Sequence, residues 1–191
     1  MIRLDEGLAH SRAAARLDPL SVQPFHDMAI NALIRGDCEQ AAAGFRHTIA
    51  IDPNWTWGYI KLGRTLAIQK KCKDAFVQTE IAERRIAGGA GALSRPWLGA
   101  TYGTCGDTAR AHQKLGELHT LEVKQHGDPV AFADIHAALG EMDEALRWYE
   151  KALDERSPVF ALAASRILPQ LADNPGYQAI VRRMAFPQPA K

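Results

Sequence analysis

Apolar and polar residues follow one another along this chain with the spacing of amphipathic helices. Between Val22 and Pro53, one apolar stripe recurs at i, i+3, i+4 and i+7, a Gly36-Asp37 turn follows, and a second stripe comes after it. The pattern predicts a hairpin of two helices. A single hairpin of this kind cannot bury its apolar face, so it needs copies stacked beside it.

The hairpin pattern recurs with a period of 34 residues. Asp18-Pro19 returns as Asp52-Pro53, and the phase continues past a glycine-rich stretch over 87–92 that inserts about two residues. We therefore expect an all-α fold with residues 1–191 in a single domain. Its parts are a half repeat at 1–21, four repeats at 22–55, 56–91, 92–125 and 126–159, and capping helices with a tail at 160–191.

The two ends of the chain depart from the pattern. Residues 4–17 carry the signature of a second helix whose first helix is absent, so the chain begins halfway through a unit. At the other end we expect a short helix over 159–168, stopped by Pro169, and a last helix that starts near Pro175 and runs to Met184.

Composition and charge exclude several classes of protein. The chain is 47% hydrophobic and 24% charged, so it can form a core. Its net charge is +1, and its longest basic cluster, over 70–73, is typical of a solvated turn, which argues against a nucleic-acid partner. No apolar run approaches the roughly 20 residues of a membrane span. The N-terminus lacks a secretory h-region, so we expect a cytoplasmic protein without membrane contact.

The three cysteines, Cys38, Cys72 and Cys105, are expected to be free thiols. Cys38 and Cys72 occupy the same repeat position, and equivalent positions of neighbouring hairpins should lie about 8–10 Å apart or more. A disulfide tolerates at most about 7 Å between Cα atoms. Free thiols also agree with the expected cytoplasmic location.

No constellation of residues predicts catalysis or a bound cofactor. His112, His119 and His126 recur every seven residues, which is about 10.5 Å along a helix and too far for two imidazoles to hold one metal ion. The cysteines lie near turns, without an oriented base in the same pattern. Paired carboxylates such as Asp5-Glu6 are first-turn residues that the helix dipole favours. We expect no metal, no cofactor and no enzymatic activity.

Residues at fixed repeat positions resemble those of the tetratricopeptide repeat (TPR). Positions 7, 8 and 11 carry Leu62, Gly63 and Leu66 in the second repeat and Leu98, Gly99 and Tyr102 in the third. Small residues at positions 8, 20 and 27 would let helices approach closely, while large ones fill the space between them. The second repeat departs from the family pattern at Thr79, where an aromatic residue is usual. The resemblance implies a right-handed α-solenoid of TPR-like hairpins.

The C-terminal part of the chain is similar to a bacterial group of TPR proteins, on the basis of residues 143–157 followed by 174–184. In that group the repeats form the C-terminal half of signalling proteins. The N-terminal halves are winged-helix DNA-binding domains or adenylate or guanylate cyclase domains, and this sequence encodes neither. The resemblance implies a sensory or regulatory role, and an open reading frame upstream of Met1 would identify the chain as a fragment of such a regulator.

The TPR resemblance also implies a partner-binding groove on the concave face, lined by positions 2, 5, 9 and 12 of each first helix. The candidate residues are Gln23, His26 and Ile30 in the first repeat, Trp57, Ile60 and Arg64 in the second, and Asp134 in the fourth. Tryptophan and arginine often dominate interface energies, although Trp57 could instead pack against the neighbouring first helix. The lysine and asparagine with which chaperone-binding TPR domains hold a peptide carboxylate are absent, because His26 and Ile30 stand in their places.

Three hypotheses follow. The first is a protein–protein interaction module, a scaffold or regulator, for which Trp57→Ala with Arg64→Glu should weaken capture of a protein or peptide partner and leave helicity unchanged. The second is the regulatory fragment of a larger bacterial regulator or cyclase. The third is a homo-oligomer formed through the N-terminal half repeat, whose leucines lack a partner helix.

Overall fold

The computed structural model describes residues 4–87, 96–125, 128–157, 160, 171 and 173–183. Its helices are α1 (Leu4–Leu17), α2 (Val22–Ile34), α3 (Cys38–Ile51), α4 (Thr56–Ile68), α5 (Cys72–Ala87), α6 (Pro96–Thr104), α7 (Thr108–Gln125), α8 (Pro129–Leu139), α9 (Met142–Asp154) and α12 (Pro175–Arg183). The described residues contain no strand, which confirms the predicted all-α class. The short helix predicted over 159–168 lies outside the described residues, apart from the helical Phe160.

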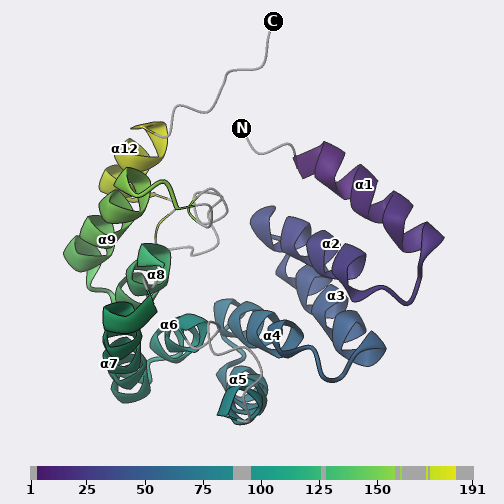
Figure 1. Cartoon of the computed structure of the whole chain (residues 1–191), viewed down its shortest axis with the longest axis horizontal. Coiled ribbons are helices and arrows are strands. Elements are labelled where there is room, and N and C mark those ends of the chain that lie inside the picture. Colours follow the sequence, from purple (N-terminus) through teal and green to yellow (C-terminus); the bar gives the residue numbers. More distant parts are fainter. Residues whose placement is uncertain are drawn as a thin grey trace, which may run out of the picture.

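The helices pack in sequence as hairpins that follow an arc (Figure 1). Within each hairpin the two helices lie side by side, as α4 with α5 and α8 with α9. The α6 helix contacts both α4 and α8, and these three helices form the inner layer of the arc. The second helices α5 and α7 lie on its outer side (Figure 1).

The turns between paired helices share one backbone conformation. Gly36, Gly106 and Gly140 have φ of +81°, +81° and +82°, in the left-handed region that glycine adopts without strain. Lys70 holds the equivalent place in the second hairpin, with φ of +62°. Glycine accommodates this conformation at three of these four turns, and Lys70 adopts it at the remaining one.

Side-chain caps start several of the helices. The carboxylate of Asp37 accepts a hydrogen bond from the Gln40 backbone N–H at 2.9 Å, and that of Asp107 accepts one from the Arg110 N–H at 3.0 Å. Pro129 occupies the first turn of α8 after its cap Asp128. These caps lie at the starts of α3, α7 and α8.

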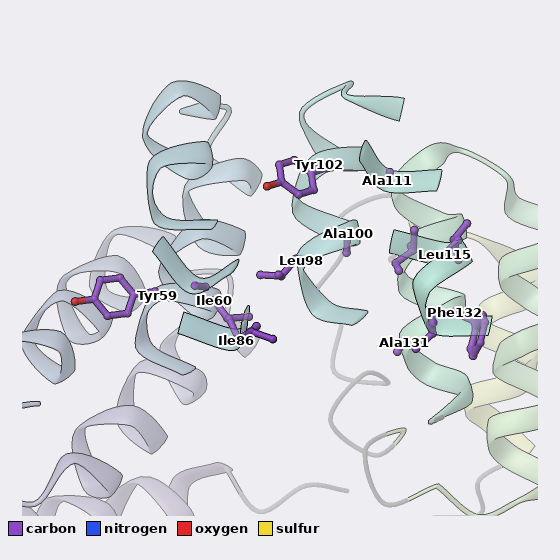
Figure 2. Close-up of a cluster of buried hydrophobic side chains, with 13 residues drawn as sticks. Tyr59, Ile60, Ile86, Leu98, Ala100, Tyr102, Ala111, Leu115, Ala131 and Phe132 are labelled. Carbon is purple, nitrogen blue, oxygen red and sulfur yellow. The ribbon is translucent and has the colours of Figure 1, made fainter. Parts of the chain in front are cut away.

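The largest core cluster runs from α4 and α5 across α6 to α7 and α8 (Figure 2). Close approach of the helices depends on glycine. A Cβ on Gly99 would lie 2.6 Å from Cδ1 of Ile135, and one on Gly63 would lie 2.8 Å from Oγ1 of Thr79. The predicted role of small residues at repeat position 8 is therefore confirmed at both glycines.

The expectation of three free thiols is wrong for two of them. Cys72 and Cys105 form a disulfide with 5.6 Å between their Cα atoms, and only Cys38 is free among the three. The distance limit applies to equivalent repeat positions, whereas Cys72 starts α5 and Cys105 follows the end of α6. These non-equivalent positions meet because α5 packs against α6. Disulfides are rare in the cytosol, so the bond weighs against the predicted cytoplasmic location, which stays a prediction.

None of the described helices is both long and apolar enough to cross a membrane.

Candidate partner-binding surface

Two tryptophans from adjacent inner helices meet at the surface. Trp57 lies in the first turn of α4 and Trp97 in the first turn of α6, and their ring centroids are 6.4 Å apart. Both side chains are partly exposed, although both also pack against the core. Trp57 therefore contacts the neighbouring first helix, as the alternative prediction stated, and its side chain also remains partly exposed.

The ammonium group of Lys61 lies beside both indole rings. Its Nζ is 5.3 Å from the Trp57 centroid and 4.9 Å from the Trp97 centroid. Lys61 follows Trp57 by four residues on α4, so both side chains lie on one face of the helix. Burial lowers the pKa of Lys61 to about 8, assisted by the nearby Arg64 guanidinium and opposed by Asp134. The three side chains form what we call the Trp–Lys–Trp cluster.

Beneath this cluster, a buried ion pair joins the second and fourth repeats. An Nη of Arg64 lies 2.8 Å from a carboxylate oxygen of Asp134, and the two side chains are only 3% and 5% exposed. The Tyr149 hydroxyl donates a hydrogen bond to the other Asp134 oxygen at 2.5 Å. Burial, followed by the Asp134 charge, raises the pKa of Tyr149 well above its usual value. The Tyr149 phenol that contacts Asp134 is therefore neutral at pH 7.

Repeat position 9 explains how this pair forms. Arg64, Ala100 and Asp134 occupy that position in three consecutive repeats, on α4, α6 and α8. Ala100 is buried and small, which leaves room for the longer side chains on either side to meet. Buried charges require such partners, because an isolated charge in the interior costs several kcal/mol.

Two buried polar atoms of the inner helices have no hydrogen-bond partner among the described residues. They are Nε of Arg64 on α4 and Oγ1 of Thr101 on α6. Buried polar groups in native proteins are nearly always satisfied, so unpaired ones mark a place where water or a ligand group can bind.

The predicted groove residues differ in how far they reach the surface. Gln23 is exposed, and its side-chain amide donates a hydrogen bond to the Asp27 carboxylate at 2.8 Å. Ile30 is partly buried and packs against the core cluster that includes Ala29, Leu33 and Phe45. Ile60, Arg64 and Asp134 are buried, and the exposed fractions of the whole residues are 1%, 3% and 3%. These three line the interior rather than an open groove. Their predicted contact with a partner stays a prediction, and their observed contacts are internal.

His26 is held between aromatic rings. Its ring centroid lies 4.7 Å from that of Trp55 and 5.5 Å from that of Phe45, and its buried Nδ1 has no hydrogen-bond partner among the described residues. Burial, with a smaller contribution from the Lys61 charge, lowers the pKa of His26 to about 4. His26 is consequently neutral at pH 7.

Two residues of the Trp–Lys–Trp cluster are not among the groove residues predicted from the sequence. Lys61 and Trp97 both occupy repeat position 6, outside the four positions that the TPR resemblance assigns to the groove. Their shared position was a signal, because equivalent positions on adjacent inner helices come close together. The opposite charges of Arg64 and Asp134 at position 9 were a similar signal.

Two other features lie away from this surface. The Glu141 carboxylate contacts Nδ1 of His136 at 2.6 Å and Nε2 of His112 at 3.4 Å. A cavity of about 370 Å³ lies between α5, α6 and α7, lined in part by Glu83, Lys114 and Glu117.

Within the described part of the chain, no set of three or more His, Cys, Asp or Glu side chains could hold a metal ion.

Comparison with models of known protein families and with curated protein sequences finds no match to this chain.

Proposed function

We propose that the chain is a right-handed α-solenoid of TPR-like hairpins that binds a protein partner on its concave face, as a scaffold or regulatory module. The observation that carries this proposal is the pair of partly exposed tryptophans, Trp57 and Trp97, on adjacent inner helices. Tryptophan supplies a large contact area at low entropic cost and is enriched at the centres of interfaces. The arc of hairpins in Figure 1 provides a concave surface of the kind that repeat proteins use for binding.

The buried ion pair changes the variant that tests this proposal. Replacing Arg64 by glutamate would place two carboxylates together in the interior, so loss of binding could follow from unfolding alone. Trp57→Ala is the better variant, because Trp57 is partly exposed. Trp148→Ala is a matched control, because Trp148 is also partly exposed but lies on the second helix α9, where its ring stacks on Phe132 of α8.

The probe is a library of random dodecapeptides displayed on phage. Peptides are selected for binding to the immobilised chain, and those that also bind an unrelated immobilised protein are removed. Circular dichroism and thermal unfolding first establish that each variant is folded. We expect the selected peptides, remade synthetically, to bind Trp57→Ala at least about tenfold more weakly than the wild type, the loss typical of a truncated interface hot spot. Trp148→Ala should bind them like the wild type. Failure to enrich any peptide, or equal binding to both variants, would contradict the proposal.

Self-association through α1 is a second proposal, supported by a separate observation. Leu17, the last residue of α1, and Leu20, in the turn that follows, are 88% and 80% exposed, and α1 itself contains no buried residue. Large exposed leucines three residues apart in the sequence favour contact with a second copy. Sedimentation equilibrium of the wild type and of Leu17→Glu/Leu20→Glu tests this. A concentration-dependent dimer lost in the variant would support self-association, and a monomer at high concentration would exclude it.

A further inference from the structure

Lys61 is a cation without a carboxylate partner. Among the described residues no Asp or Glu oxygen lies within ion-pair distance of its Nζ, and its close contacts are the faces of Trp57 and Trp97. The stretches outside the described residues contain no Asp or Glu at all.

The surface around the tryptophans therefore carries one uncompensated positive charge. Arg64 and Asp134, the two charged groups that act on Lys61, form an ion pair and offset each other. His26 on α2, whose pKa is lowered by burial and, to a smaller extent, by the Lys61 charge, is neutral at pH 7. Cation–π contacts stabilise a lysine by about 0.5–2 kcal/mol and use none of the three hydrogen-bond donors of the ammonium. Among the described residues no acceptor takes a hydrogen bond from Lys61 Nζ.

We propose that Lys61 binds the carboxylate of an aspartate or glutamate side chain in a partner peptide, while an apolar neighbour of that side chain packs on Trp57 and Trp97. This inference rests on the proposed function and specifies the chemistry of the partner. Charge complementarity selects an acidic group, and the indole faces select an adjacent apolar group. The partly desolvated position strengthens the pair relative to one in water.

The same geometry connects binding to pH. The free protein's Lys61 loses its charge near pH 8, because of burial and the neighbouring guanidinium. A carboxylate ligand favours the charged form, so binding of an acidic peptide should weaken as pH rises through 8 and 9. A surface lysine with the ordinary pKa of about 10.4 would remain charged over that range.

Two synthetic peptide libraries test the proposal. Both consist of N-acetylated, C-amidated nonapeptides whose random positions are drawn from uncharged residues, and the central residue is glutamate in one and glutamine in the other. Retention on the immobilised chain is measured by mass spectrometry at pH 7. We expect the wild type to retain the glutamate library about tenfold more strongly, the size of a net charge-assisted hydrogen bond.

Variants assign this preference to one side chain. Lys61→Met keeps the length of the side chain, and it should reduce the ratio between the libraries to about one. Lys61→Arg keeps the charge and should preserve the preference, as should Lys73→Met, which removes an exposed lysine from α5. At pH 9.5 the wild-type ratio should fall toward one. Thermal unfolding checks that every variant is folded.

Each other outcome contradicts a defined part of the argument. Equal retention of both libraries by the wild type overturns the role of the acidic group but leaves peptide binding intact. A preference that survives in Lys61→Met, or that is unchanged at pH 9.5, assigns the carboxylate to another cation and overturns the role of Lys61. Retention of neither library contradicts the proposed function itself, and this inference with it.

Discussion

The first and second helices of the hairpins bury very different surfaces. Most residues of the inner helices α4 and α8 are buried, including the charged Arg64 and Asp134. The second helices α5 and α9 bury a single stripe, and their charged residues mostly stay in water. The α9 helix shows this well, since its Glu144–Arg147 pair lies on the surface.

The reason for the difference is the number of neighbours around each layer. The inner helix α6 lies against α4, α5, α7 and α8, whereas the outer helix α7 packs against α6 and α8. A polar side chain on an inner helix must therefore find a partner inside the protein, while one on an outer helix can be hydrated. This difference predicts where a substitution will be costly, and four measurements test it.

The largest effect is expected from Asp134→Ala. This variant leaves Arg64 buried without its carboxylate and removes the acceptor of the Tyr149 hydroxyl. We expect the free energy of unfolding in urea to fall by about 3–5 kcal/mol. Glu144→Ala, which removes an exposed ion pair on α9, should change it by no more than about 0.5 kcal/mol. Comparable losses in both variants would refute the contrast between the layers.

The disulfide links the start of the outer helix α5 to the residue after the inner helix α6. Breaking it by Cys72→Ser/Cys105→Ser should lower the free energy of unfolding by about 2–4 kcal/mol, because the loop that it closes is then free in the unfolded chain. Cys38→Ser, at a free thiol, is the control. A thiol assay in denaturant should find one thiol before reduction and three after it, and three before reduction would show that the bond does not form.

His26 should make stability depend on acid pH. Its folded pKa of about 4 lies below its ordinary 6.5, so the unfolded chain binds the proton first as pH falls. The stability that this histidine contributes is complete above about pH 6.5 and should be lost, by about 2–3 kcal/mol, between there and pH 4. Urea unfolding of His26→Phe should lack this part of the pH dependence. The exposed His47→Gln should retain it, and parallel curves for all three proteins would contradict the assignment.

The smallest effects come from adding one methyl group to each layer. Gly63→Ala on α4 forces a Cβ to within 2.8 Å of Thr79 Oγ1 and 3.2 Å of the Ala75 carbonyl oxygen, and it should destabilise by about 1–3 kcal/mol. Gly116→Ala on α7 meets no atom within 4 Å and should stabilise by about 0.5–1 kcal/mol. Thermal unfolding gives both signs. A stable Gly63→Ala would show that the inner helices have more room than the contacts indicate.

Helix positions were largely predictable from the sequence. The α1 helix spans Leu4–Leu17 as predicted, and α2 and α4 begin at Val22 and Thr56, one period apart. The reason is that helical amphipathicity, caps and glycine turns are local properties, which neighbouring residues determine among themselves. The C-terminal helix likewise starts at Pro175, after the cap Asn174.

The candidate site was predictable only in part. Trp57 was predicted to line the groove and is partly exposed, whereas Arg64 and Asp134, predicted for the same groove, are buried against each other. Their contact with a partner stays a prediction, because the position of a residue within its own repeat does not reveal its neighbours in the other repeats. Whether position 9 faces water depends on which residues stand at that position in the neighbouring repeats.

By itself, the sequence determined the helical class and the places where helices start and turn, because short-range periodicity and capping decide both. Only the tertiary structure decided which distant side chains meet. The Cys72–Cys105 bond, the Arg64–Asp134 pair and the place of Lys61 between two tryptophans all cross from one repeat to another. Such contacts depend on the distance and rotation between stacked hairpins, and a period of 34 residues contains neither quantity.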